Sequence, residues 1–87
     1  MGGIHATFCP EEAGSRVDSV VTGEAESVWG RVLDDALAGT LEPVYHGALE
    51  DMGSAPMPRH DLLPEGYYFG SIQTTRGCPL DCSFCSV

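Results

Sequence analysis

The sequence predicts an α/β fold, in which strands and helices alternate along the chain. Three segments indicate it. A short run at 17–21, rich in valine, ends at a Thr-Gly pair, which is typical of a buried strand. From 24 to about 38, apolar residues recur at steps of three and four, the spacing that forms one face of a helix. A second short strand is expected at 43–45. This order of elements is typical of the tail of an open α/β sheet.

The residues that flank these segments predict further features. Residues 2–7 fit the end of a strand that turns into a loop, and 8–13 fit a short helix with Pro10 in its first turn. Gly39 stands where a helix commonly ends at a left-handed glycine. Trp29 falls on the apolar face of the long helix, so we expect it to lie in the core.

A change of composition divides the chain into parts. Residues 47–66 include three prolines and show no hydrophobic period, which predicts a linker between domains. Residues 67–75 are rich in aromatic and β-branched types and predict a strand that runs directly into a group of cysteines. We therefore expect one domain segment at 1–46, the linker at 47–66, and the start of a second domain at 67–87.

The charge balance disfavours a nucleic-acid partner. The 87-residue chain has four basic residues, all arginine, against 13 acidic ones, and its formal net charge is −9 at pH 7. Binding to a phosphate backbone relies on clustered cations that release counterions, and this segment lacks them. The acidity fits a solvated, soluble surface.

Length and hydrophobicity define the class of protein further. The chain is short for one domain and far too short for two complete ones, while its 43% hydrophobic content argues against disorder. No apolar run approaches the roughly 18–20 residues that span a bilayer. The first residues lack the basic stretch and apolar core of a secretory signal, so a cytoplasmic location is expected.

Three of the four cysteines lie close together, with Cys78, Cys82 and Cys85 in the spacing C-x3-C-x2-C. Thiolate is the preferred ligand of iron–sulfur clusters and of zinc, and three thiolates this close can surround one metal centre. Without an export signal, metal-binding cysteines fit better than disulfides. Three protein ligands would leave one iron of a four-iron cluster open to a small molecule.

The spacing alone leaves other interpretations open. The same three thiolates could form a structural zinc site completed by His60 or Asp81, which would make the chain a small zinc-binding module. Disulfides or unbound thiols are a further alternative. Cys9 is distant in sequence from the other cysteines, and we expect it to be a small buried side chain and not a cluster ligand.

The cysteine segment resembles the radical S-adenosylmethionine superfamily. The resemblance rests on the cysteine spacing, on Phe84 before the third cysteine, and on the preceding Thr-Arg-Gly-Cys-Pro at 75–79. It implies that the three cysteines ligate a [4Fe–4S] cluster whose open iron binds S-adenosylmethionine. One-electron reduction by an external donor, such as a flavodoxin or a ferredoxin, would then release a 5′-deoxyadenosyl radical. The resemblance also makes 67–75 the first strand of a partial β/α barrel.

The segment before the linker resembles the last third of the cobalamin-binding domain that precedes many of these enzymes. The matching stretches are 2–7, 10–12 and 20–26, with Pro58-Arg59 and 61–63 in the linker. The resemblance implies that strand-end glycines and their polar neighbours line the cobalamin, in agreement with the position of ligands in doubly wound sheets. The implied contacts are Gly2, Gly3, His5, Thr22, Gly23 and Glu24. Methyl transfer to an unactivated carbon is one reaction that this family implies, and ring rearrangement is another.

The predicted fold is therefore the C-terminal part of a Rossmann-like cobalamin-binding domain, joined by the linker to the first strand and cluster loop of a partial, TIM-like β/α barrel. The earlier strands of that domain and the rest of the barrel have no counterpart in the sequence. We expect a fragment of a longer enzyme that is inactive alone. We also expect Tyr67, Phe69 and Ile72 to be uncovered, because one strand cannot cover its own faces.

Overall fold

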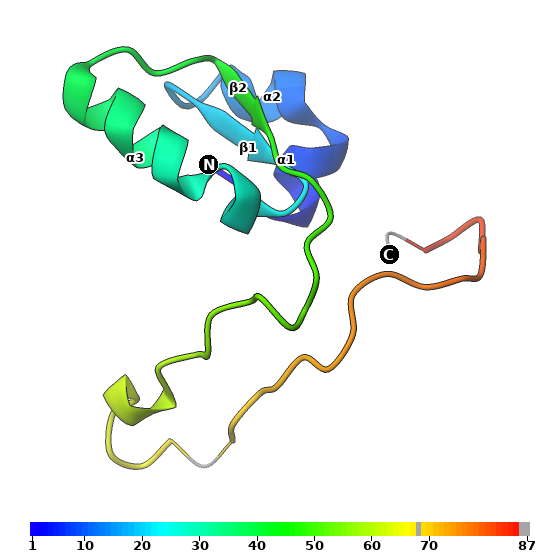
Figure 1. Cartoon of the computed structure of the whole chain (residues 1–87). Helices are drawn as coiled ribbons and strands as arrows, with labels where there is room; N and C mark the ends of the chain where they lie inside the picture. Colours follow the sequence, from blue (N-terminus) through cyan, green and yellow to red (C-terminus); the bar gives the residue numbers. More distant parts are fainter. Residues whose placement is uncertain (68, 86–87) are drawn as a thin grey trace. The chain divides into compact units, whose positions relative to one another are not determined.

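The structure, a computed structural model, describes residues 1–67 and 69–85. The chain divides into two compact units, Met1–Glu50 and Asp51–Val87, which we call the sheet unit and the cysteine unit. Figure 1 shows the chain coloured along its sequence. The elements of the sheet unit are α1 (Ile4–Phe8), α2 (Pro10–Gly14), β1 (Val20–Thr22), the 3₁₀ turn η1 (Ala25–Ser27), α3 (Trp29–Ala38) and β2 (Val44–His46).

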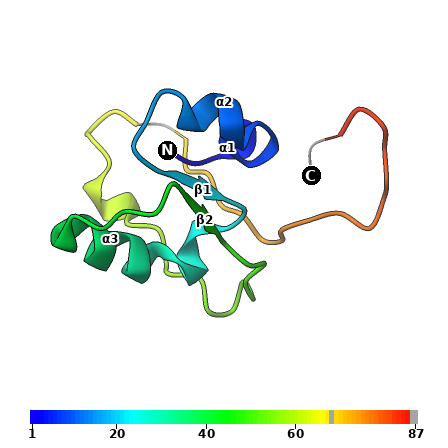
Figure 2. The ribbon, with the colours of Figure 1, turned by 90° about the horizontal axis from the view of Figure 1, so that it is seen from above.

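The sheet unit is a small three-layer arrangement. β1 and β2 pair in parallel, with Val20 opposite Val44 and Thr22 opposite His46. Helices α1 and α2 lie on one face of this pair, and α3, which makes the crossover between the strands, lies on the other (Figures 1 and 2). The core between α1, α2 and β1 consists of Ala6, Ala13 and Val20. The strands predicted at 17–21 and 43–45 are present in part, as β1 and β2, and the predicted crossover helix forms.

The N-terminus lies along the other edge of β1. The ammonium group of Met1 donates to the Ser19 carbonyl at 2.7 Å, and the Val21 N–H donates to the Met1 carbonyl at 2.8 Å. These two bonds have the pattern of a parallel bridge opposite the residue between them. Met1 therefore continues the parallel pairing by one residue.

The loop predicted at 2–7 is wrong, because a helix begins at Ile4. Gly3, with φ of 99°, turns the chain, and its carbonyl accepts the Thr7 N–H at 3.0 Å. Ala6 is 1% exposed and packs against β1. Burial of this small side chain favours a helix where the local sequence shows no period, which is a tertiary effect that a sequence pattern does not show. The helix predicted at 8–13 is present as α2.

The predicted helix at 24–38 forms as the turn η1 followed by α3. It ends at Gly39 as expected, in the left-handed conformation with φ of 72°, and the Thr40 N–H donates to the Asp35 carbonyl at 2.9 Å. The prediction that Trp29 lies in the core is wrong, since 52% of the residue is exposed. It borders a hollow of about 480 Å³ whose other walls include Met1, Val21 and Leu33. The apolar face of α3 is thus only partly covered.

The cysteine unit has little regular structure in its described residues. Its one short helix there is the 3₁₀ turn η2 (His60–Leu62), within the segment predicted as a linker. The described residues of 67–75 do not form the predicted strand, because the described part of that unit holds no neighbouring strand to accept its hydrogen bonds. Tyr68, which that prediction includes, lies outside the described residues. The expected exposure of Tyr67, Phe69 and Ile72 is confirmed.

The described elements are too few to assign a complete fold. Two paired strands do not test the Rossmann-like assignment, and the described part of the cysteine unit does not test the barrel assignment, so both stay predictions. In the ranges 1–67 and 69–85, no helix combines the length and apolar character needed to cross a membrane.

Candidate functional site

The cysteines of the predicted cluster loop lie at the surface of the cysteine unit. Cys78, Cys82 and Cys85 are exposed free thiols. The Cys85 N–H donates to the Cys82 carbonyl at 3.0 Å, so a turn links the second and third cysteine positions. Directly before the first cysteine, Gly77 has φ of 78°, a left-handed conformation that strongly favours glycine. The loop therefore bends next to each end of the cysteine motif.

The three thiols do not surround a common point in the described residues. There, no group of three or more His, Cys, Asp or Glu side chains is placed to hold a metal ion. This finding applies equally to the alternatives that add His60 or Asp81. Thiolates repel one another until a cation lies between them, and metal coordination supplies free energy that closes such loops. The iron–sulfur and zinc interpretations both stay predictions.

Cys9 belongs to the sheet unit, whereas the other three cysteines belong to the cysteine unit. It is exposed, so the prediction of a buried side chain is wrong. Cys9 forms the turn between α1 and α2, where its N–H donates to the His5 carbonyl at 2.8 Å and its carbonyl accepts the Ala13 N–H at 3.0 Å. Both helices use its backbone, and the one-residue link leaves its side chain outside the core.

The second candidate region is the edge at which β1 and β2 end. Parallel strands end at the same edge, and ligands of α/β sheets bind beyond such edges. Here the Thr22 hydroxyl oxygen and His46 Nδ1 lie 2.8 Å apart. The N–H of the next residue, Gly23, donates to the Thr7 hydroxyl oxygen at 3.1 Å. The edge therefore carries two threonine hydroxyls and an imidazole.

Two glycines make this edge possible. Gly23 has φ of 71°, and a Cβ built on it would lie 2.4 Å from the Gly47 carbonyl oxygen. A Cβ built on Gly47 would lie 1.8 Å from the Glu24 carbonyl oxygen. Real Cβ atoms do not approach backbone atoms this closely, so packing within the chain alone requires glycine at both positions. This is a reason for Gly23 that does not depend on a ligand.

Gly2 and Gly3 lead from the β1 edge into α1. A Cβ on Gly2 would lie 3.4 Å from the Val21 carbonyl oxygen, which is an ordinary contact, whereas a Cβ on Gly3 would meet no atom within 4 Å in the described part of the chain. The backbone at Gly3 is therefore open to close approach. Its φ of 99° also disfavours any other residue.

The remaining expected contacts have partners within the sheet unit. His5 Nε2 lies 3.7 Å from a carboxylate oxygen of Glu12, and both side chains are exposed. Glu24 Oε2 accepts the Glu50 N–H at 2.9 Å. The structure thus places Thr22 and Gly23 at the edge itself, while Glu24 holds the chain that leaves β2.

Sequence reasoning missed His46, Gly47 and Thr7. The signal for the first two is present in the sequence, because β2 ends in His-Gly as β1 ends in Thr-Gly. Aligning the ends of two strands that pair in parallel places both dipeptides at one edge. Thr7 belongs to the helix that the sequence pattern did not indicate, so no comparable signal points to it.

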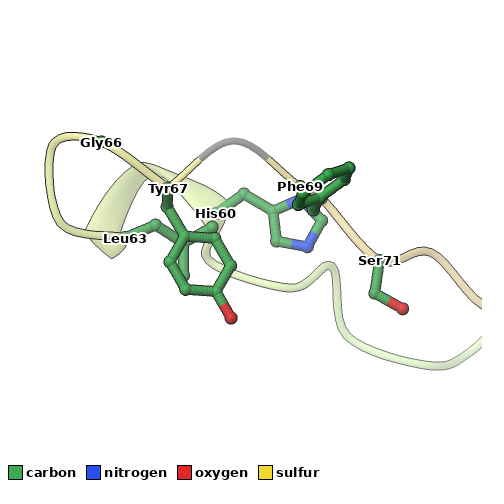
Figure 3. Close-up of a pocket in the computed structure, with 7 residues that line it drawn as sticks. His60, Leu63, Gly66, Tyr67, Phe69 and Ser71 are labelled. Atoms are coloured by element: carbon green, nitrogen blue, oxygen red, sulfur yellow. The ribbon is translucent and has the colours of Figure 1, made fainter.

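A separate cavity of about 520 Å³ lies in the cysteine unit (Figure 3). His60, Leu63, Tyr67 and Phe69 line it, together with Gly66, Gly70 and Ser71. Just before η2, Arg59 donates two hydrogen bonds to the Asp61 carboxylate, at 2.7 and 2.6 Å. These bonds hold the pKa of Asp61 below its usual value. None of the three cluster cysteines lines this cavity.

Comparison with known proteins gives several relatives. The chain is 34% identical over 94 residues to bacteriochlorophyllide d C-8(2)-methyltransferase of Chlorobaculum tepidum, covering 98% of this chain and 21% of that protein. It is 33% identical to bacteriochlorophyllide d C-12(1)-methyltransferase of the same organism, covering 99% and 20%. An uncharacterized methyltransferase of Pyrococcus horikoshii is 33% identical over 111 residues, covering 99% and 24%.

In each of these matches, this chain aligns with one part of a longer protein. Nearly all of this chain aligns, but it spans only a fifth to a quarter of the length of the relatives it matches. No family model matches the chain. No solved structure matches it either. What the comparisons show is therefore similarity to one segment of several longer proteins that are named as methyltransferases.

Proposed function

We propose that this chain is a segment of a cobalamin-dependent radical S-adenosylmethionine methyltransferase. The observation that carries the proposal is the similarity to named methyltransferases through 98–99% of the chain, which includes both units. The three-cysteine motif narrows the type of methyltransferase, because ordinary methyl transfer from S-adenosylmethionine needs no metal ligands of this kind. The substrate is a small molecule with a carbon atom that accepts the methyl group.

The donor set of the cysteine loop fits an iron–sulfur cluster in its chemistry. Three free, exposed thiols lie at the surface, where a cluster and a small ligand can both reach them. When bound, a [4Fe–4S] cluster with one iron free of protein ligands supplies one-electron reductive cleavage of S-adenosylmethionine. Its electron would come from a flavodoxin or a ferredoxin. This chain would supply three thiolates, two of them from the turn that links Cys82 and Cys85.

The open backbone at Gly3 and the polar strand ends fit a large ligand at the edge of the sheet unit. A Cβ at Gly3 would meet no described atom, so a ligand can approach that backbone closely. When bound there, cobalamin supplies a carrier for the methyl group. The proposed contacts are Gly2, Gly3, Thr22 and Gly23, with His5 and Glu24 on neighbouring segments.

The test is anaerobic reconstitution of the full chain with iron and sulfide. We expect about four irons and four sulfides per chain and a broad absorption band near roughly 400 nm, as [4Fe–4S] proteins in general show. Changing Cys78, Cys82 or Cys85 to alanine should abolish cluster binding, because each removes one of only three ligands. Cys9→Ala is the matched control, since Cys9 is an exposed thiol in the other unit.

Two results would contradict the proposal. One is iron binding that is lost in Cys9→Ala. The other is stoichiometric zinc, bound in preference to iron and dependent on His60 or Asp81, which would establish the structural zinc site. Zinc would show no visible absorption, so colour and metal analysis distinguish the two sites.

A further inference from the structure

The imidazole of His46 has one nitrogen held and the other free. Nδ1 lies 2.8 Å from the Thr22 hydroxyl oxygen, across the last pair of residues in the parallel sheet. Nε2 has no hydrogen-bond partner in the residues that the structure describes, and the side chain is exposed. The hydrogen bond to Thr22 restricts the ring, because it leaves only Nε2 for a partner outside the chain.

The tautomer of His46 decides what Nε2 offers. If the Thr22 hydroxyl donates to Nδ1, Nε2 carries the proton and donates; if Nδ1 donates to Thr22, Nε2 accepts. The carboxamide groups that surround a corrin ring can pair with either form, because each has a carbonyl oxygen and an NH₂ group. A corrinoid at this edge would therefore satisfy His46 in both tautomers.

Glu24 is used differently. Its carboxylate accepts the Glu50 N–H at 2.9 Å, and nearby the Ser27 hydroxyl oxygen accepts the Ala48 N–H at 2.9 Å. The Gly47 N–H donates to the Thr22 carbonyl at 2.8 Å. These three bonds hold the segment 47–50 where it leaves β2. The side chain of Glu24 acts on the backbone of this chain.

We propose that His46 is a polar contact for a corrinoid carboxamide at the edge formed by β1 and β2, and that Glu24 is a positioning residue that holds 47–50. This inference rests on the proposed function. It adds to the site a residue that sequence reasoning missed, and it moves Glu24 from ligand contact to support. The juxtaposition that carries it is Thr22–His46 at the strand ends, on the sheet unit in which Gly2 contacts β1 and Gly3 has an open backbone.

The test is titration of the ¹⁵N-labelled full chain with cyanocobalamin, followed by two-dimensional NMR. Cyanide and the nucleotide base occupy both axial positions of its cobalt, so ligation by histidine or cysteine does not contribute. In the unmodified chain we expect saturable shifts of the amides of Gly2, Gly3, Thr22 and Gly23. Affinity will be low, because one short edge buries little of the ligand.

Two variants separate contact from support at position 46. Asparagine can replace Nδ1 but does not reach the position of Nε2, so His46→Asn keeps a partner for Thr22 and should weaken binding about three- to tenfold, the effect of one lost hydrogen bond. Glutamine reaches the position of Nε2, so His46→Gln should bind more tightly than His46→Asn. The control is His60→Asn, because His60 is an exposed histidine in the cysteine unit. This variant should bind as the unmodified chain does.

The role of Glu24 has its own readout. Glu24→Gln keeps an oxygen that can accept the Glu50 N–H, so both binding and the exchange rate of that amide should stay within about twofold of the unmodified chain. Glu24→Ala removes the acceptor and should accelerate exchange of the Glu50 amide about tenfold or more. Weaker corrinoid binding by Glu24→Gln with unchanged amide exchange would mean that the carboxylate touches the ligand, and would overturn its positioning role.

The outcomes also separate this inference from the proposed function. If the unmodified chain shows no saturable shift at this edge, the corrinoid assignment fails, and the role of His46 fails with it. If the chain binds and His46→Asn binds equally well, only the role of His46 is overturned. If His46→Asn weakens binding about three- to tenfold and His46→Gln weakens it less, the contact through Nε2 is supported. If both variants bind equally weakly, the contact through Nε2 is overturned.

Discussion

The two units of the chain differ in whether they bury residues of the types that favour strands. In the sheet unit, Val20 and Tyr45 are almost fully buried between paired strands and helices. In the cysteine unit, Tyr67, Phe69 and Ile72 form a similarly apolar stretch, yet all three are exposed. Both sets of residues are β-branched or aromatic types, which favour strands. The difference lies in the neighbours that each stretch finds within its own unit.

Hydrogen bonding explains the contrast. The two strands of the sheet unit form hydrogen bonds with each other. Tyr45 is held further by its hydroxyl group, which donates to Asp35 at 2.7 Å and accepts the Glu42 N–H at 3.0 Å. Burial and the bond to Asp35 raise the pKa of Tyr45. The described residues of 67–75 have no such partner strand, so extended backbone there remains solvated. Strand propensity becomes a strand only where a second strand can pair with it.

The largest effect we expect is at Gly47, where the sheet unit tolerates no side chain. In Gly47→Ala the new Cβ would meet the Glu24 carbonyl oxygen at 1.8 Å, and backbone must move to relieve it. We expect a loss of about 3 kcal/mol or more in the free energy of unfolding, enough to unfold a unit this small. Amide spectra by NMR would lose the dispersed signals of Val20, Val21 and Tyr45.

A matched substitution checks that this effect is local to the close contact. Gly53→Ala places a Cβ 3.2 Å from a flexible carboxylate oxygen of Asp51, which can turn away. Its spectrum should keep the signals of the sheet unit. A folded, unperturbed Gly47→Ala variant would show that the approach of 47 to 24 is looser than the structure has it.

The comparison itself is tested by truncating one β-branched residue in each unit. Val20→Ala removes two methyl groups from a residue with 0% exposure and should cost about 2 kcal/mol in urea unfolding followed by circular dichroism. Ile72→Ala removes more atoms, but its residue is 77% exposed, so we expect a change of less than about 0.5 kcal/mol. Equal losses in the two variants would show that Ile72 is buried in solution and would remove the distinction between the units.

How much of the fold the sequence predicts depends on the range of the forces involved. The crossover helix and its end at Gly39 follow from local period and from glycine chemistry, and both are found. Helix α1 does not follow from local pattern, because it depends on burying Ala6 against β1. The strand predicted at 67–75 is absent from the described residues, and the reason is again tertiary. Its residues favour a strand, but pairing depends on a distant neighbour.

The candidate sites show the same division. The cysteine motif can be identified from the sequence alone, because its three thiols lie within one short segment. The edge of the sheet is different. The position of Thr22 at the end of a strand indicates it as a site residue. His46 is 24 residues further along the chain, and it becomes the partner of Thr22 only because β1 and β2 pair in parallel in this register. The sequence indicates Glu24 by its position after β1, whereas its hydrogen bond to the Glu50 N–H is found from the structure.

The smallest effect we expect comes from one glycine-to-alanine substitution made in each unit. Gly30 lies in the first turn of α3, does not have a left-handed φ, and a Cβ there would meet no described atom within 4 Å. Gly30→Ala should therefore raise stability by about 0.5 kcal/mol, since alanine favours the helix and restricts the unfolded chain, and raise the midpoint of thermal unfolding by about 2–4 °C. Gly70 is equally free of contacts, but the described residues around it belong to no helix or strand. Gly70→Ala should leave the midpoint unchanged within about 1 °C, because restricting a segment that does not fold cooperatively adds nothing to the transition. An equal rise in both variants would mean that the two units unfold as one cooperative structure.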